Sequence, residues 1–293
     1  MEHLKTILQL AASGSVGALV LAVGLDATLD NVLYVLRRPA LLARAFLAIS
    51  VIVPAIAVIV VYLLPLTLVV KVGVILMALA PVPPLVPRKN VKQGGRKEYV
   101  YGLYVAFAVL AIVIVPATVS MLNRLYGSSA QVPMAAMERT VSVVVLLPLV
   151  IGLVVRAFWP KFAAAAKPWV SRLSMLLLLI LIVPIVVVAF PAIARLIGNG
   201  TVLAILLIVL AGIVGGHLLG GPDPRDRATL AATAATRHPG IAMLIANASF
   251  QDMGVAAVVL LFLLEALVIV ALYQAWLRRS AHPQLDRAAG SPT

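Results

Sequence analysis

The chain has 293 residues, of which 63% are hydrophobic and 11% are charged, and its formal net charge is +13. Soluble domains are about 45–50% apolar and about 25% charged, so this composition excludes an ordinary soluble protein and indicates a helical membrane protein. The absence of cysteine excludes disulfides, thiolate metal sites and cysteine redox chemistry. Because the basic residues fall in short connections, we assign the positive charge to topology and contact with the lipid bilayer, not to nucleic acid.

Apolar stretches of about 20 residues, the length that crosses a bilayer, recur along the chain. Short connections with turn residues separate them. Residues 1–279 are therefore expected to form one transmembrane domain, with a first repeat over about 7–121 and a second over about 140–277, and residues 280–293 a disordered cytoplasmic tail. We predict nine transmembrane helices, at about 7–25, 45–64, 67–86, 99–121, 140–158, 170–197, 201–219, 228–245 and 253–277.

The distribution of basic residues predicts the orientation in the membrane. If the first connection lies inside, most of the 23 Lys and Arg residues fall in inside loops, and the densest run is 88–97. Cytoplasmic loops carry such an excess of Lys and Arg. We therefore expect the N-terminus outside, the C-terminus in the cytoplasm and a location in the plasma membrane, in bacteria the inner membrane.

Two of the predicted spans cannot run as straight helices. The eighth contains Arg237-His238-Pro239-Gly240, and the third ends in a proline-rich stretch at 80–87. Proline removes a backbone donor and clashes with the preceding turn. Broken backbone at membrane depth persists only where protein covers it or water reaches it, and paired breaks in two repeats mark a transporter's binding site. The predicted crossover and hinge residues are Pro81, Pro83, Pro84, Pro87, Pro239 and Gly240.

Several motifs, in order along the chain, carry a family resemblance. They are the glycine-rich helix 17–25 followed by Arg38-Pro39, the Pro116-Ala117 pair, the Leu-Leu-Pro-Leu-Val-Ile-Gly-Leu run at 146–153, and the segment 229–250. With these motifs the chain resembles the bile acid:sodium symporter family, within the wider bile/arsenite/riboflavin transporter superfamily. The resemblance implies an all-α polytopic fold in its nine-helix form, with inverted repeats, a panel and a core domain, and two crossed discontinuous helices.

The positions of the family's sodium ligands differ here. The first crossover reads Pro81-Val82-Pro83 where the family has Pro-Gly-Gly, and the family's hydroxyl ligands fall on Val100 and Tyr104. The sodium-bridging Glu falls on Thr233, and the sodium-contacting Gln falls on Arg237. Sodium needs several oxygen ligands and nearby negative charge, so we do not carry the sodium sites over.

Three ionisable residues within the spans are candidates for function. The Arg237 guanidinium can replace the charge of bound sodium and attract an anionic substrate, or it is a structural arginine paired with a carboxylate or with carbonyls freed by the break. His238 can carry protons, or it hydrogen-bonds loose backbone. Glu265 can pair with Arg237 as a gate or shuttle a proton, or it forms a purely structural ion pair or, when protonated, a helix contact.

Polar side chains near the second break complete the candidate set. Thr233 and Thr236 can present hydroxyls to the substrate, or they are small residues that let two broken helices cross closely. Asn247 lies farther along the same span. We predict that Arg237, His238, Glu265, Thr233, Thr236 and Asn247 bind substrate or couple its transport.

The predicted function is secondary transport of a small or amphipathic organic anion by alternating access. We expect it to be independent of sodium, as a uniporter or coupled to protons. The alternatives are a sodium symporter whose ligands lie at other positions, and a membrane sensor or receptor that kept the fold. No cofactor, catalytic metal or nucleophile constellation is predicted, so an enzyme is not expected; the sequence predicts no oligomeric state.

Overall fold

The computed structural model describes residues 2–126, 142–249 and 253–289, and for some of these, Asn247 among them, only the course of the helix. This described part is helical and contains no strand, as predicted for the all-α class. The first-half helices are α1 (Glu2–Asp26), α2 (Leu29–Leu36), α3 (Pro39–Phe46), η1 (Leu47–Ile52), α4 (Val53–Leu63), α5 (Leu68–Leu79), α6 (Leu85–Lys92) and α7 (Lys97–Tyr126). The second-half helices are η2 (Ser142–Leu146), α9 (Leu147–Phe158), α10 (Pro160–Leu196), α11 (Thr201–Leu219), α12 (Pro224–Ala235), α13 (Pro239–Ser249) and α14 (Met253–Ala289).

Helix length and apolar composition support a protein that crosses the membrane several times. Within the described residues, five helices are long and apolar enough to span it, or six if α1 and α2 count as one span bent by 91°. The apolar helices Leu68–Leu79 and Ser142–Phe158 are shorter. The total of nine therefore stays a prediction. At the C-terminus, α14 runs to Ala289, where the sequence led us to expect a tail from residue 280.

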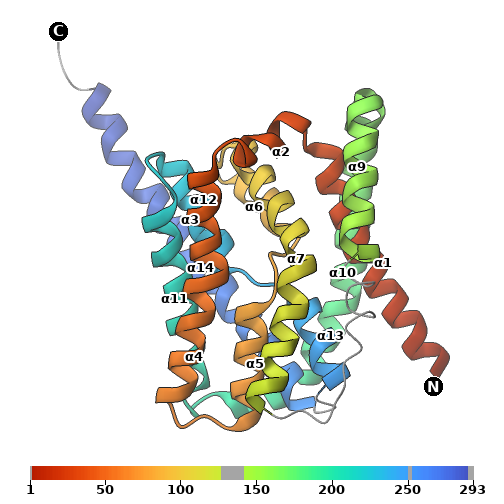
Figure 1. Ribbon diagram of the computed structural model, residues 1–293, viewed down its shortest axis with the longest axis vertical. Coiled ribbons are helices and arrows are strands. Elements are labelled where there is room, and N and C mark those ends of the chain that lie inside the picture. Colours follow the sequence, from red (N-terminus) through yellow and green to blue (C-terminus); the bar gives the residue numbers. More distant parts are fainter. Residues whose placement is uncertain (1, 127–141, 250–252, 290–293) are drawn as a thin grey trace.

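The helices form two groups, which Figure 1 shows side by side. In the first, α1 packs against both α9 and α10, and we call these three helices the panel. The backbones of α1 and α9 meet where a Cβ on Gly24 would lie 2.6 Å from the Leu149 carbonyl oxygen. Lys167 of α10 forms an ion pair with Asp26 of α1 at 2.6 Å. We call the remaining helices the core.

Two broken segments lie within the core. The first is α5 and α6, and the second is α12 and α13. The first half of each segment packs against the second half of the other: α5 against α13, and α6 against α12. This is the arrangement expected of two crossed discontinuous helices. The long helix α14 packs against α5, α10, α11 and α13, so it links the crossing segments to the panel.

Helices α11 and α12 approach each other closely because glycine and alanine meet at their interface. A Cβ on Gly216 would lie 2.5 Å from the Ala231 Cα, closer than real Cβ contacts allow. Small residues let the backbones of membrane helices come together in this way. The alanines Ala231, Ala234 and Ala235 thus allow close packing of α12 against the continuous helix α11, whereas the crossing of two broken helices that the sequence suggested for this stretch stays a prediction.

We predict that Gly216→Ala destabilises the protein, because the added methyl group must push α12 away from α11. Overpacking of this kind costs about 1–3 kcal/mol. The neighbouring Gly215→Ala is a matched control, since its Cβ would meet Ile52 at an ordinary 3.4 Å. Thermal unfolding in detergent should show a lower melting temperature for Gly216→Ala and an unchanged or higher one for Gly215→Ala; equal melting of the two variants would contradict the packing argument.

Candidate functional site

The two breaks lie where proline interrupts the helices. The first spans residues 80–84, between α5 and α6, and holds Pro81, Pro83 and Pro84. Pro87 lies within the first turn of α6, where proline is tolerated because that turn's N–H groups have no helical partner. The second break spans residues 236–238. Pro239 is the first residue of α13, the position at which proline favours a helix start, and Gly240 follows it inside the helix.

Backbone hydrogen bonding joins the two breaks directly. The His238 N–H donates to the Pro81 carbonyl oxygen at 2.9 Å. The His238 imidazole turns to its own helix, where Nδ1 accepts the Ile241 N–H at 3.4 Å and caps the start of α13. This geometry matches the hydrogen bond to loose backbone that the sequence left open, and the proton-carrying role stays a prediction.

Arg237 bridges the first break to helix η1. Its side chain is buried, with an exposed fraction of 3% for the residue. One terminal nitrogen donates to the Ile49 carbonyl at 2.7 Å, and the other donates to the Ala80 carbonyl at 3.3 Å. Hydrogen bonds to a charged group contribute about 1.5–3 kcal/mol each. The Arg237 guanidinium is thus held by backbone carbonyl oxygens from two other segments.

Proline explains why these two carbonyls need a partner. In η1 the π-helical pattern would pair the Ile49 carbonyl with the nitrogen of residue 54, which is Pro54 and has no N–H. An α-helix continuing past α5 would pair the Ala80 carbonyl with residue 84, which is Pro84. A buried carbonyl without a donor costs about 1–3 kcal/mol. The guanidinium supplies both missing donors from one side chain.

A cavity of about 240 Å³ lies between the panel and the core and reaches both breaks. Its panel wall comes from α1 and α10, and its core wall from both broken segments and α14. The wall is almost entirely apolar. The polar side chains that line it are Lys89, Asn90, Thr236, Arg237, His238 and Gln274.

The other predicted site residues are placed as follows. Thr236 lines the cavity, and its hydroxyl donates to the Ala232 carbonyl at 2.7 Å. Thr233 is buried; its hydroxyl donates to the Thr229 carbonyl at 2.7 Å and accepts from the Asn90 amide at 3.1 Å. Glu265 lies on α14 away from the positions that line the cavity, and among the described residues it forms no ion pair with Arg237. The side chain of Asn247 lies outside the described part.

Sequence reasoning did not place three polar residues at the site, although it weighed anion attraction or contact with anionic lipid as an alternative for the run 88–97. Lys89 and Asn90 lie on α6, within a basic run that we read as an orienting turn, and Gln274 lies near the end of α14. Asn90 and Gln274 also line a second cavity of about 240 Å³, beside the turn that follows α6. One signal was available in the sequence: Gln274 is a polar residue in the apolar repeat of α14 that includes Leu263, Leu267 and Val270.

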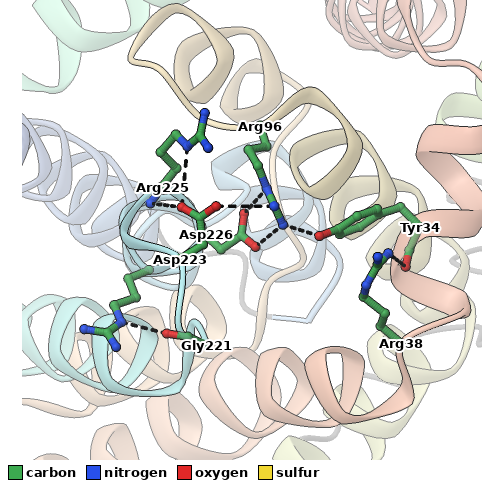
Figure 2. Close-up of polar contacts among 8 residues, drawn as sticks. Tyr34, Arg38, Arg96, Gly221, Asp223, Arg225 and Asp226 are labelled. Atoms are coloured by element: carbon green, nitrogen blue, oxygen red, sulfur yellow. Dashed lines mark hydrogen bonds and ion pairs between the residues drawn. The ribbon is translucent and has the colours of Figure 1, made fainter.

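A charged cluster ties the core together at the end predicted to be cytoplasmic, as Figure 2 shows. The Arg96 guanidinium binds the Asp226 carboxylate at 2.6 and 3.1 Å, lies 3.3 Å from Asp223 and donates to the Tyr34 hydroxyl. Burial raises the pKa of the Asp226 carboxyl, although Arg96 opposes this shift. Burial also acts to lower the pKa of Arg96, but the charge and hydrogen bond of Asp226, together with Tyr34 and Asp223, outweigh burial and raise that pKa. The cluster fixes the starts of α7 and α12 to α2.

Apolar helices, two crossed breaks and a cavity that reaches both breaks are features of a polytopic membrane protein. The model of the Sodium Bile acid symporter family matches residues 15–196, more than half of the chain, and the chain therefore belongs to this family. The match confirms the resemblance inferred from the motifs. It ends before α12 and α13, so the segment with Arg237 lies outside it. In a comparison with curated proteins, none matched the sequence significantly.

We predict that Arg237→Leu destabilises the protein by about 1–3 kcal/mol for each carbonyl that it leaves without a donor. Thermal unfolding measures this loss. Arg195→Leu is the control, because Arg195 is exposed near the end of α10. Melting of Arg237→Leu at the temperature of Arg195→Leu would contradict the bridging role.

We predict that Arg96→Met is also destabilising, because it leaves the buried Asp226 carboxylate without its cation. Breaking a buried pair from one side costs about 3–5 kcal/mol. Arg225→Met should cost less than about 1 kcal/mol, since the Arg225 side chain is 64% exposed and its pair with Asp223 is at the surface. Comparable losses in the two variants, measured by thermal unfolding, would count against the cluster's role.

Proposed function

We propose that the protein is a secondary transporter that moves a small or amphipathic organic anion by alternating access and needs no sodium. Membership of a symporter family supports the transporter class. The cavity supports a small-molecule substrate with an apolar body, because it lies between two helix groups and its wall is almost entirely apolar. We expect the protein to act as a uniporter or to couple transport to protons.

The observation that carries sodium independence is the Arg237 bridge. Backbone carbonyls at a helix break are the oxygens that transporters use to coordinate sodium. Here the Ile49 and Ala80 carbonyls accept hydrogen bonds from a guanidinium whose charge is part of the chain. A sodium ion at this place would have to displace Arg237 and meet its positive charge at short range.

The contacts of Thr233 support the same conclusion. At this position the family's bridging carboxylate would supply negative charge, and threonine supplies none. The Thr233 hydroxyl donates a hydrogen bond to the Thr229 carbonyl oxygen. Its oxygen accepts a hydrogen bond from the Asn90 amide, so a donor of the protein already lies against this oxygen. A hydroxyl oxygen has two lone pairs, and Asn90 uses one of them, so Thr233 offers a cation one lone pair and no negative charge.

The test is uptake into proteoliposomes of a labelled bile acid and of labelled aliphatic carboxylates, with sodium or with potassium as the only alkali cation. We expect equal initial rates in the two media. Strict dependence of uptake on sodium would refute the proposal.

A second measurement needs no substrate. A ligand that binds only the folded state raises the melting temperature, so a bound sodium ion should reveal itself as a higher melting temperature in sodium than in potassium at equal ionic strength. We expect no difference for the wild-type protein. A shift that saturates with sodium concentration would contradict the proposal.

A further inference from the structure

One cation on the cavity wall has no partner within the part of the chain that the structure describes. Lys89 of α6 lines the cavity, and among the described residues its ammonium forms no ion pair and no hydrogen bond. Other cations in the core are engaged. Arg88 donates to Ser171 at 2.9 Å, Arg96 binds Asp226, and Arg237 donates to two carbonyls. No described residue therefore neutralises the charge of Lys89.

A second polar group with unused donors lies at the same end of the cavity. Gln274 of α14 lines the cavity and is 6% exposed. Its Oε1 accepts a hydrogen bond from the Gln93 amide, while its own amide nitrogen has no acceptor among the described residues. Gln93 is the C-cap residue of α6, one turn after Lys89, and its hydrogen bond to Gln274 places Lys89 and Gln274 at the same end of the cavity. The Lys89 ammonium and the Gln274 amide are both hydrogen-bond donors.

Toward the two breaks the lining includes Thr236, Arg237 and His238, but the exposed wall of the cavity is almost entirely apolar. From Gln274 the wall continues along one face of α14, whose residues follow a spacing of three and four. By the rise of a helix this row is about 21 Å long. The residues of the row are Leu260, Leu263, Leu267, Val270 and Gln274. The cavity therefore has donors at one end and a long hydrocarbon surface behind them.

We propose that Lys89, with the amide of Gln274, binds the anionic head group of the transported substrate, and that the substrate body is an elongated hydrocarbon without hydrogen-bonding groups. This inference rests on the proposed function and names the substrate class of that site. The head group is a carboxylate or sulfonate, because two donor groups without an acceptor between them select an oxyanion.

The engagement of Arg237 assigns the head group to Lys89. Both terminal nitrogens of Arg237 already hold carbonyls, and releasing them would leave buried acceptors unpaired. Binding an anion at Lys89 breaks no contact within the protein. An ammonium beside an apolar wall has lost part of its hydration, and a bound anion compensates for that loss with a charged hydrogen-bond partner. The two cations thus have separate tasks: Arg237 holds the breaks together and Lys89 binds the ligand.

The experiment uses two fluorescent probes that share one aromatic skeleton. Anilinonaphthalene sulfonate carries an anionic head, and N-phenylnaphthylamine lacks it. Binding to the full-length protein in nanodiscs is measured with empty nanodiscs subtracted. We expect Lys89→Met to weaken sulfonate binding roughly tenfold or more and to leave the neutral probe within about twofold. Lys89→Arg, which keeps the charge, should retain most of the sulfonate affinity.

The matched control is Lys92→Met, because Lys92 is exposed, lies on the same helix and does not line the cavity. It should bind both probes as the wild type does. If Lys89 only extends toward the membrane surface, Lys89→Met binds the sulfonate within twofold of the wild type, and the inference fails while the proposed function stands. If the wild type binds neither probe, the cavity takes no amphipathic ligand and both fail.

Discussion

The hydrogen bonds from Arg237 to the Ile49 and Ala80 carbonyls are the interaction on which the arrangement of the core depends. Prolines at positions 54 and 84 remove the donors that these carbonyls would find in continuous helices. Arg237, in the break of the second segment, supplies two hydrogen-bond donors in their place. The His238 N–H adds a third hydrogen bond, to the Pro81 carbonyl oxygen. Each break therefore completes the backbone hydrogen bonding of another segment, which lets irregular backbone persist at membrane depth.

This constraint also shapes the cavity. Because the crossing segments hold each other, the side chains beside the breaks have fixed positions at the wall that faces the panel. The close contact of α11 with α12 extends the rigid part to a neighbouring helix, since no side chain separates the backbones at Gly216 and Ala231. The panel meets the core through fewer packed helices, mainly α10 against α14. Relative movement of panel and core is thus the motion that breaks the fewest contacts.

The sequence predicted the helical class, both breaks and the family, because each depends on local signals: continuous apolar runs, prolines within them and short ordered motifs. It did not predict the partner of Arg237. The choice among a carboxylate, a substrate and freed carbonyls depends on where residues 157 and 188 positions away in the chain come to lie. Lys89 was read as part of a basic turn for the same reason. Only the packing of α6 against the cavity separates it from Arg88 and Lys92.

A charge fixed in the chain has a consequence for the energetics of the transport cycle. A sodium ion that accompanies an anion cancels its charge and brings the energy of the sodium gradient, whereas the guanidinium of Arg237 stays with the protein. A monoanion that crosses without a coupled cation moves one negative charge through the membrane potential, about 2.3 kcal/mol per 100 mV. With the cytoplasm negative this favours outward movement by about fiftyfold in concentration at 100 mV. In the uniporter form of the proposed function, replacing a mobile cation by Arg237 therefore turns the thermodynamic preference of the carrier from accumulation toward release.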